Sequence, residues 1–301
     1  MTPTPAPELN GILLVDKPAG WTSHDVVARV RRLSGQRRIG HTGTLDPAAT
    51  GLLVLCLGPA TRLVEYLTGH HKDYEGEIQL GVITATDDAA GDVLARAAPP
   101  PLSDRSLRDL ERAFSGNLLQ TPPAFSAVQV GGRRAYDAAR RGTPLDLPAR
   151  PVEVERLHLA LTAPDRLQAT VRCGPGTYIR SLARDIGESL GCGAHLASLR
   201  RTRVGGFHVE QAFTLDELGA LAAAGLLGAA VRPADDGLID FDAVLLGRTL
   251  EAEVRHGSRV AVAASRASNR ARVYGTDGAL VAIAEVSEAG QLRPLKVLSA
   301  P

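Results

Sequence analysis

Cysteine is scarce in this chain. Of 301 residues only three are cysteine, Cys56, Cys173 and Cys192, and they lie far apart with no CxxC pair. Structural zinc sites and disulfide frameworks depend on closely patterned cysteines, so this spacing argues against both. We therefore expect a reducing, cytoplasmic environment and no bound metal.

Long apolar runs are also missing. No stretch approaches the roughly 20 residues that span a bilayer. The opening residues MTPTPAPELN have neither the basic flank nor the apolar centre of a signal peptide. We predict a protein without membrane contact and a disordered, Pro-rich tail over residues 1–9.

Aromatic side chains and net charge are low as well. One Trp, five Phe and five Tyr leave the core to be built mainly from Leu, Val, Ile and Ala. The apolar fraction of 44% excludes wholesale disorder, and the length leaves room for two domains. The net charge of +1 decides nothing about nucleic acid, because positive charge can gather on one face.

Strand and helix patterns are both present, without strict alternation. Helical spacing of Val26, Val27 and Val30 predicts a helix that Ser23 caps and Gly35 ends. The irregular order of the elements favours an α+β fold over a doubly wound sheet. A short strand that runs into a Pro-Gly turn is predicted in GILLVDKPAG (11–20), and further strands at 51–58, 72–81, 152–161 and 167–174. Further helices are predicted at 60–67, 103–114 and 177–191.

The C-terminal part has a different pattern. VRPADDG (231–237) predicts a linker, and short β-type runs separated by Gly and Asp-Gly turns follow it. A β-rich domain of roughly 65 residues can fold alone. The predicted division is a tail over 1–9, a main domain over 10–231 and a second domain over 232–301.

Motifs for common cofactors are absent from the sequence. GPGTYIR (174–180) lacks the third glycine of a dinucleotide-binding loop. The eight His residues show no HExxH spacing, and no GxSxG elbow surrounds a serine. We expect neither a nucleotide cofactor, nor a metal, nor serine-hydrolase chemistry.

A single acid, Asp46, lies in IGHTGTLDPAATGLLVL (39–55), ahead of a buried strand. An Asp-Pro dipeptide is often only a turn. His41, Thr42, Gly43 and Thr44 crowd the same loop, and loops held by a rigid strand often carry function. Both interpretations of Asp46 stand at this point.

Tyr74 and Arg180 are further candidates with ordinary explanations. Tyr74 lies on an alternating strand, where an aromatic residue is usually part of a sheet face. Arg180 lies in the first turn of a helix with an apolar inner face, and a buried arginine there would require an acid. A surface position for Arg180 is equally consistent with the pattern.

Arginines gather in three clusters, at 29–38, 131–142 and 199–203. They could form solvated faces. Arg outnumbers Lys in all three, which suits phosphate recognition, so the clusters modestly favour a nucleic-acid partner.

Several of these motifs together resemble a known family. GILLVDKPAGWTSHDVV, IGHTGTLDPAATGLLVL, KDYEGEIQLG, TPPAFSAVQVGGRRAYDAAR and GTYIRSLARDIG occur in the order found in TruB-type tRNA pseudouridine synthases. The C-terminal part resembles, more loosely, their PUA RNA-binding domain. The resemblance implies a mixed, largely antiparallel central sheet flanked by helices, followed by a small β-rich PUA-like domain.

The resemblance also implies roles for individual residues. Asp46 is the catalytic aspartate, Tyr74 stacks on the target base, and Arg180 pairs with Asp46. Gln129 stands where the family usually has Lys, at a structural position, so catalysis is expected to remain. The implied substrate contacts are His41 in the gap left in the RNA loop, Tyr178 and Leu199 in the uridine pocket, Gly43 and Thr44 beside Asp46, and Lys17 with Pro18 as a brace.

The implied activity is isomerisation of uridine to pseudouridine at position 55 in the T-loop of tRNA, after the base has been flipped out. It requires no cofactor, metal or obligate protein partner. A single carboxylate is enough, whereas hydrolysis of a glycosidic bond normally uses two. The alternatives are a guide-RNA-dependent subunit of the same superfamily and a non-catalytic tRNA-folding chaperone. The short N-terminal tail without basic extensions favours the stand-alone enzyme.

Overall fold

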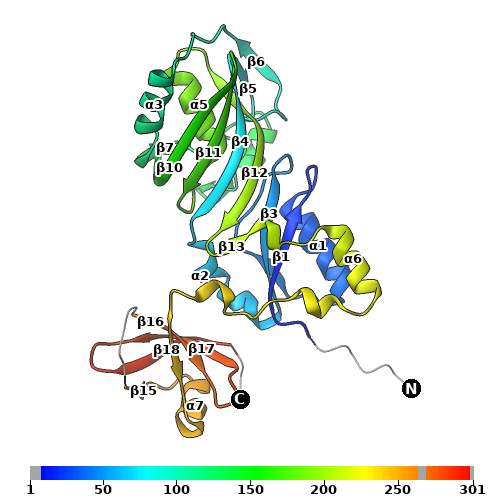
Figure 1. Ribbon diagram of the computed structural model, residues 1–301, viewed down its shortest axis with the longest axis vertical. Coiled ribbons are helices and arrows are strands. Elements are labelled where there is room, and N and C mark those ends of the chain that lie inside the picture. Colours follow the sequence, from blue (N-terminus) through cyan, green and yellow to red (C-terminus); the bar gives the residue numbers. More distant parts are fainter. Residues whose placement is uncertain (1–7, 264–268, 299–301) are drawn as a thin grey trace.

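A large twisted sheet forms the frame of the molecule (Figure 1). The computed structural model describes residues 8–263 and 269–298. The sheet has nine strands, and seven of them follow the order β1-β3-β12-β4-β11-β10-β7, with β2 paired to β3 and β13 to β12. These strands are β1 (Gly11–Lys17), β2 (Ile39–His41), β3 (Thr50–Leu57), β4 (Lys72–Leu80), β7 (Gly116–Gln120), β10 (Arg150–Ala163), β11 (Arg166–Cys173), β12 (Ala194–Val204) and β13 (Phe207–His208).

The sheet has two halves that meet at β3 and β12. This pair is parallel and short, joining Arg200 to Thr50 and Arg201 to Gly51, whereas every other pair in the sheet is antiparallel. The expected mixed, largely antiparallel sheet is therefore confirmed. At the junction Gly51 has φ +97°, and a Cβ there would lie 2.3 Å from the carbonyl oxygen of Arg201. Only glycine permits this close approach of the two strands.

Helices cover both halves of the sheet (Figure 1). In one half α1 and α6 lie side by side, and in the other α3 contacts β10 while α5 contacts β12. Residues 60–67, predicted as one helix, fall in a 3₁₀ turn followed by a short α-helix. The helices are α1 (Ser23–Ser34), η1 (Gly58–Leu63), α2 (Val64–Thr68), α3 (Asp104–Ala113), α5 (Ile179–Ser189), η2 (Val209–Gln211), α6 (Leu215–Ala223), η3 (Leu227–Ala230) and η4 (Asp236–Leu238).

The start of α1 corrects one prediction. Thr22, and not Ser23, is the N-cap: its side chain accepts from the backbone N–H of Asp25, and the Asp25 carboxylate accepts in return from the backbone of Thr22. The Ser23 hydroxyl is instead bonded to both backbone groups of Leu45, at 2.8 and 3.1 Å. The helix ends as predicted at Gly35, whose φ of 69° is left-handed.

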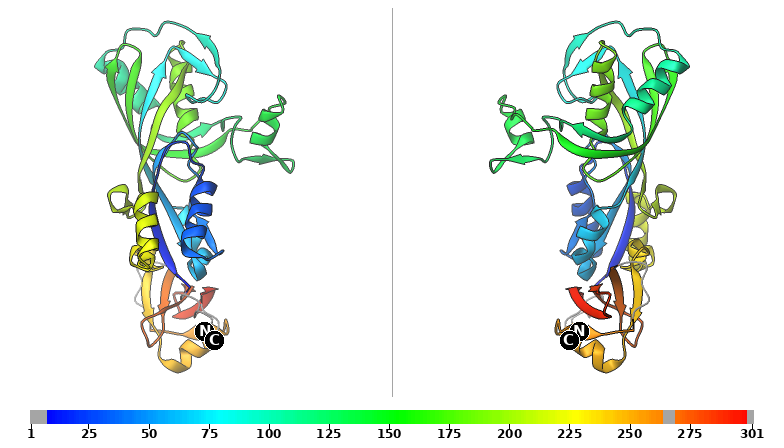
Figure 2. Two further views of the ribbon diagram at one scale, coloured as in Figure 1. Left: turned by 90° about the vertical axis from the view of Figure 1, so that its right-hand side faces the viewer. Right: turned by 90° about the vertical axis from the view of Figure 1, so that its left-hand side faces the viewer.

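Residues 121–149 leave the sheet between β7 and β10 and form an arm that stands out from the body (Figure 2). The arm carries β8 (Gln129–Val130), β9 (Arg133–Arg134) and α4 (Ala135–Arg140) around a small apolar cluster of its own. A second segment outside the main sheet follows the C-terminal end of β4. It is the hairpin of β5 (Val82–Thr84) and β6 (Val93–Arg96).

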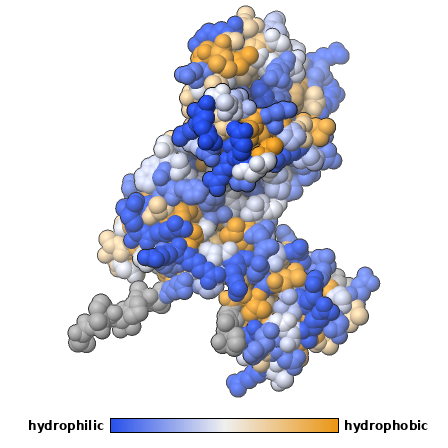
Figure 3. Space-filling model, turned by 180° about the vertical axis from the view of Figure 1, so that it is seen from behind, coloured by the Kyte–Doolittle hydropathy of each residue, from blue (hydrophilic) through white to orange (hydrophobic). Residues whose placement is uncertain are grey.

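The C-terminal part is a five-stranded sheet with one helix, and it forms a lobe of the surface (Figure 3). This β-rich unit confirms the predicted fold class. Its elements are β14 (Asp242–Leu245), α7 (Arg248–Arg255), β15 (Val260–Ala261), β16 (Arg270–Tyr274), β17 (Leu280–Val286) and β18 (Gln291–Val297).

An apolar cluster joins the lobe to the main sheet. Ile283 and Leu298 of the lobe share this cluster with Ile12 and Leu52. The segment predicted as a linker, 231–237, lies against β1, where Arg232 and Ile12 exchange backbone hydrogen bonds of 2.8 and 2.9 Å. The division at residue 231 remains a proposal.

The N-terminal tail predicted over residues 1–9 lies, up to residue 7, outside the described residues. Leu9 itself is held by Gln36, which bonds both its N–H and its carbonyl, at 2.9 and 3.0 Å. No helix in the described part of the chain is long and apolar enough to cross a membrane.

Replacing Gly51 by Ala should destabilise the protein by about 2 kcal/mol or more, because the new Cβ would collide with the backbone of β12 at a left-handed φ. Urea unfolding followed by circular dichroism measures the effect. Gly206→Ala is the control, since nothing lies within 4 Å of a Cβ at that position. Equal unfolding midpoints for the two variants would contradict this account of the junction.

Candidate active site

A cavity of about 690 Å³ opens between the two halves of the sheet. Its walls come from segments that are far apart in the sequence: the loop before β3, the start of β4, the start of α5, β12 and the arm. We call this cavity the site pocket. Among its lining residues are Thr42, Gly43, Thr44, Leu45, Asp46, Pro47, Lys72, Tyr74, Phe125, Ser126, Gln129, Arg134, Tyr136, Tyr178, Ile179, Arg180, Leu199 and Arg201.

Asp46 lies in the turn that enters β3. The Ala49 N–H donates to the carbonyl of Asp46 at 3.1 Å, and β3 is buried over nearly its whole length. Behind the turn Lys17 is fully buried, and its Nζ donates to the carbonyls of Pro18, Trp21 and Pro47. These bonds fix the backbone of the turn, while 39% of the Asp46 side chain remains exposed on the pocket side.

Arg180 brings a buried positive charge to Asp46, as the resemblance implies. Its Nη2 donates to Oδ1 of Asp46 at 3.1 Å, and its Nε lies 2.9 Å from Oδ2 without the angle of a hydrogen bond. The carbonyls of Thr86 and Phe125 accept from the two terminal nitrogens, each at 3.0 Å. Only 5% of Arg180 is exposed, so the guanidinium is held on several sides.

A second acid lies near this pair, which the sequence motif does not reveal. Oδ2 of Asp88 is 3.7 Å from Nε of Arg180. Its other oxygen accepts from the Thr86 hydroxyl and from the Ala90 N–H. Asp88 is not among the residues lining the site pocket, so among the described residues that line it Asp46 alone presents a carboxylate.

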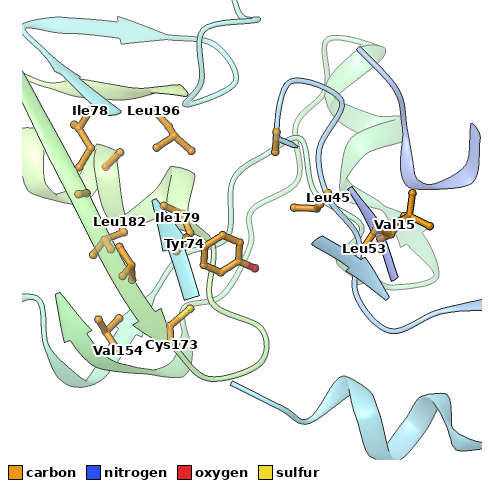
Figure 4. Packing of buried hydrophobic residues seen from close by; sticks show 14 of the residues in the cluster. Val15, Leu45, Leu53, Tyr74, Ile78, Val154, Cys173, Ile179, Leu182 and Leu196 are labelled. Atoms are coloured by element: carbon orange, nitrogen blue, oxygen red, sulfur yellow. The ribbon is translucent and has the colours of Figure 1, made fainter. Parts of the chain in front are cut away.

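Tyr74 forms part of the floor of the pocket. It lies on β4, is 7% exposed, and belongs to the main apolar cluster. Figure 4 shows its ring between Ile179 and Leu45, with the hydroxyl directed toward the Leu45 side. Burial raises the pKa of Tyr74, and the positive charge of Arg201 opposes that rise. The phenol is therefore neutral at physiological pH.

The remaining predicted contacts fall into two groups. Gly43, Thr44, Tyr178 and Leu199 line the site pocket. Lys17 lies behind the turn and His41 beside the pocket, and neither is among the residues lining it.

His41 packs edge-on against His24, with the ring centres 5.8 Å apart. Its Nδ1 is buried without a hydrogen-bond partner among the described residues. Burial, together with the neighbouring His24, lowers the pKa of His41.

Several residues of the pocket were missed in the sequence. His24 and Tyr136 line it, and both stand inside motifs quoted above, so their positions could have been found by inspecting each motif residue in turn. Lys72 also stands inside a quoted motif, KDYEGEIQLG, whereas Arg201 stands outside all of them. The cluster at 199–203 suggested an exposed RNA-binding face, but Arg201 is 1% exposed and lies beneath the loop that carries Asp46.

Buried cations surround the Asp46 loop. Burial lowers the pKa of Lys17 to about 8, although the charge of Asp46 opposes the change. Burial, with the nearby Arg201, lowers the pKa of Lys72 to about 8 as well. In residues 8–263 and 269–298, no group of three or more His, Cys, Asp or Glu side chains is arranged to hold a metal ion.

Two protein-family models match the chain. The N-terminal domain of TruB family pseudouridylate synthases matches residues 31–179, and the C-terminal domain of tRNA pseudouridylate synthase B matches residues 180–239. A tRNA pseudouridine synthase B of Thermobifida fusca is 46% identical over 298 residues, covering 96% of this chain and 99% of that protein. One of Xanthomonas oryzae pv. oryzae is 44% identical, covering 97% and 94%.

The chain belongs to the TruB family of pseudouridylate synthases. It is therefore an enzyme, an isomerase, and the predicted family and enzyme class are confirmed.

Solved structures of more distant relatives share the architecture. A Cbf5–Nop10–Gar1 complex matches with a TM-score of 0.74 at 26% identity, covering 97% of this chain and 86% of that one. An H/ACA RNP bound to a substrate RNA matches with a TM-score of 0.73 at 25% identity, with the same coverage. The mixed sheet and the C-terminal β-rich unit therefore belong to a known fold.

The low pKa of Lys72 predicts a pH effect on stability. Because the folded state binds fewer protons at Lys72 than the unfolded chain between pH 8 and the ordinary lysine pKa of 10.5, the free energy of unfolding should rise with pH across this window. Relative to Lys72→Met, the wild type should gain up to about 3 kcal/mol. Urea unfolding of both proteins between pH 7 and about 10.5 tests this, and parallel curves would refute it.

Replacing Arg180 by Met should lower the single-turnover rate of pseudouridine formation by about 100-fold or more, because Asp46 loses its partner and its fixed orientation. RNA affinity, measured by filter binding, should change by less than about threefold. Arg166→Met is the control, because Arg166 pairs with Glu77 outside the site pocket. An equal loss of rate and affinity would identify Arg180 as an RNA contact instead.

Proposed function

We propose that this enzyme converts uridine to pseudouridine at position 55 in the T-loop of tRNA, with Asp46 as the catalytic carboxylate. The observation that carries the proposal is the Asp46–Arg180 pair, whose carboxylate faces a pocket floored by Tyr74. The named relatives, tRNA pseudouridine synthases B at 44–46% identity over nearly the full length, support tRNA as the substrate.

The reaction needs little besides a held carboxylate. Uracil leaves C1′ of the ribose, turns, and rejoins the same carbon through C5, while the C5 proton moves to the vacated N1, so nothing is oxidised or lost. Asp46 acts either as a nucleophile or as a base in this sequence. Arg180 holds and orients the Asp46 carboxylate, since its buried guanidinium donates a hydrogen bond to Oδ1.

The target base must leave its stack before it can reach Asp46. Extrusion costs a few kcal/mol, which stacking in an enzyme pocket offsets. Tyr74 supplies an aromatic face at the pocket floor, and the side chains of Tyr178 and Leu199 line its walls. His41, packed against His24 at the pocket edge, is placed to fill the space that the base leaves.

The arm and the C-terminal sheet extend the RNA-binding surface in this proposal. Arg133, Arg134, Arg140 and Arg141 are all exposed on the arm, and RNA loops are recognised by shape and phosphate contacts as much as by sequence. We assign the C-terminal sheet a PUA-like role in tRNA binding. The three cysteines are buried free thiols, which fits the cytoplasmic location we propose.

A guide-RNA-dependent enzyme is the second candidate, because the structurally similar relatives include a chain of an H/ACA RNP. Sequence favours the stand-alone enzyme, since identity to the named tRNA pseudouridine synthases is 44–46% but only 25–26% to those chains. A non-catalytic tRNA-folding chaperone is the third candidate, and it would not depend on the Asp46 carboxylate.

The test is incubation of the chain alone with an unmodified T-arm stem-loop, followed by nucleoside analysis for pseudouridine. Wild type should modify the target uridine, and Asp46→Asn should lower the rate by about 10⁴-fold or more. Asp216→Asn, an exposed position on α6, is the matched control and should remain active.

Two outcomes would count against the proposal. Product that appears only after a guide RNA is added would support the guide-dependent enzyme. Product that forms equally well with Asp46→Asn would remove Asp46 from the chemistry.

A further inference from the structure

Arg201 is a buried arginine whose charge meets no carboxylate. It is 1% exposed. Across residues 8–263 and 269–298, no acidic oxygen lies within 4.0 Å of its nitrogens. Burying an unpaired charge costs several kcal/mol, so a position that keeps one is expected to have a use for it.

The guanidinium binds three backbone carbonyls around the Asp46 loop. Nε donates to Leu52 at 2.7 Å, Nη2 to Gly43 at 3.0 Å, and Nη1 to Thr44 at 3.4 Å. Leu52 lies on β3, just after the turn that carries Asp46, and Gly43 and Thr44 lie just before it. One side chain on β12 therefore fixes both ends of that turn.

The same guanidinium lies against Tyr74. Arg201 and Tyr74 are direct partners in the pairing of β12 with β4, and both line the site pocket. Residues directly opposite one another in an antiparallel pair present their side chains on the same face of the sheet, and the charge of Arg201 opposes the rise that burial causes in the pKa of Tyr74. Arg201 thus binds the Asp46 loop and is at the same time the cross-strand neighbour of Tyr74.

The surroundings leave Arg201 little freedom. A Cβ added to Gly43 would lie 3.6 Å from Nη1 of Arg201 and 3.4 Å from Cε of Lys72. Gly51 brings the backbone of β3 against the backbone of Arg201 on the other side. The loop, the strand junction and the guanidinium therefore form one packed unit.

We propose that Arg201 is a positioning residue that holds the Asp46 loop at a fixed separation from Tyr74. The planar fork of arginine donates from three rigidly spaced nitrogens and so reaches carbonyls on both sides of the turn, whereas a lysine offers a single nitrogen to which all of them would have to converge. A misplacement of about 1 Å between reacting groups can cost on the order of 100-fold in rate. The inference rests on the proposed function in one respect, because the rate assay uses the T-arm stem-loop as its substrate.

The test compares Arg201→Met and Arg201→Lys with the control Arg166→Met, an exposed arginine on β11 that pairs with Glu77 outside the site pocket. Arg201→Met should lower the single-turnover rate on the T-arm stem-loop by about 100-fold, with the dissociation constant of the RNA within about threefold. Arg201→Lys keeps the charge but not the fork, so its rate should fall between those of Arg201→Met and wild type. Arg166→Met should behave as wild type does.

A second readout needs no substrate. NMR of isotope-labelled tyrosine, with the Tyr74 signal assigned from Tyr74→Phe, follows the pKa of Tyr74. That pKa should rise in Arg201→Met, because the opposing positive charge is gone, and should stay nearer the wild-type value in Arg201→Lys.

Three results would overturn the proposal. The first is a rate loss in Arg201→Met that matches its unfolded fraction, and the second is a loss of RNA affinity equal to the loss of rate. The third is an unchanged Tyr74 pKa. If Arg201→Met does not fold, Arg201→Lys is measured by the same readouts. A wild-type rate in Arg201→Lys would then overturn the proposal. If wild type does not modify the T-arm, the proposed substrate fails, while the tyrosine measurement still decides the role of Arg201.

Discussion

The ion pair between Asp46 and Arg180 is the contact on which the site depends, because its two partners belong to different halves of the sheet. Asp46 enters β3 in one half, and Arg180 begins α5, which packs on β12. Arg180 also donates to the carbonyl of Phe125 at the base of the arm. One buried guanidinium thus connects the turn, the helix and the arm, and a shift of any one of them would disturb the carboxylate.

Much of the frame follows from local patterns. The unbroken apolar run in β3 and the alternation in β4 predict the strands that border the pocket, because burial on two faces and on one face produce these two patterns. Asp46 could be found as well, since a loop that gathers His41, Thr42, Gly43 and Thr44 directly before a buried strand is unusual. The cap of α1 was predicted one residue late because Thr22 and Ser23 are both good caps, and only the tertiary bond of Ser23 to Leu45 decides between them.

The rest of the site could not be read from local pattern. That Arg180 meets Asp46 depends on β12 lying between β3 and β4, a strand order that neither periodicity nor spacing reveals. Arg201 stands in a run of arginines that looks like a solvated face, but it is 1% exposed at the point where β12 pairs with both β3 and β4. Asp88 reaches Arg180 through a loop more than ninety residues earlier in the chain than its partner. Such meetings are set by topology and not by composition.

The place of β12 in the sheet has a consequence for how the protein is made. β3 and β4 are complete by residue 80, but they have no direct pairing and are joined only through β12, which ends at residue 204. Long-range pairing of this kind slows folding, because the chain loses the entropy of the long loop before the stabilising contacts form. During synthesis from the N-terminus, the turn that carries Asp46 therefore lacks both Arg180 and Arg201 until about two thirds of the chain has left the ribosome. Assembly of the site is thus a late event, and a truncated product that ends before β12 has no formed site with which to engage RNA.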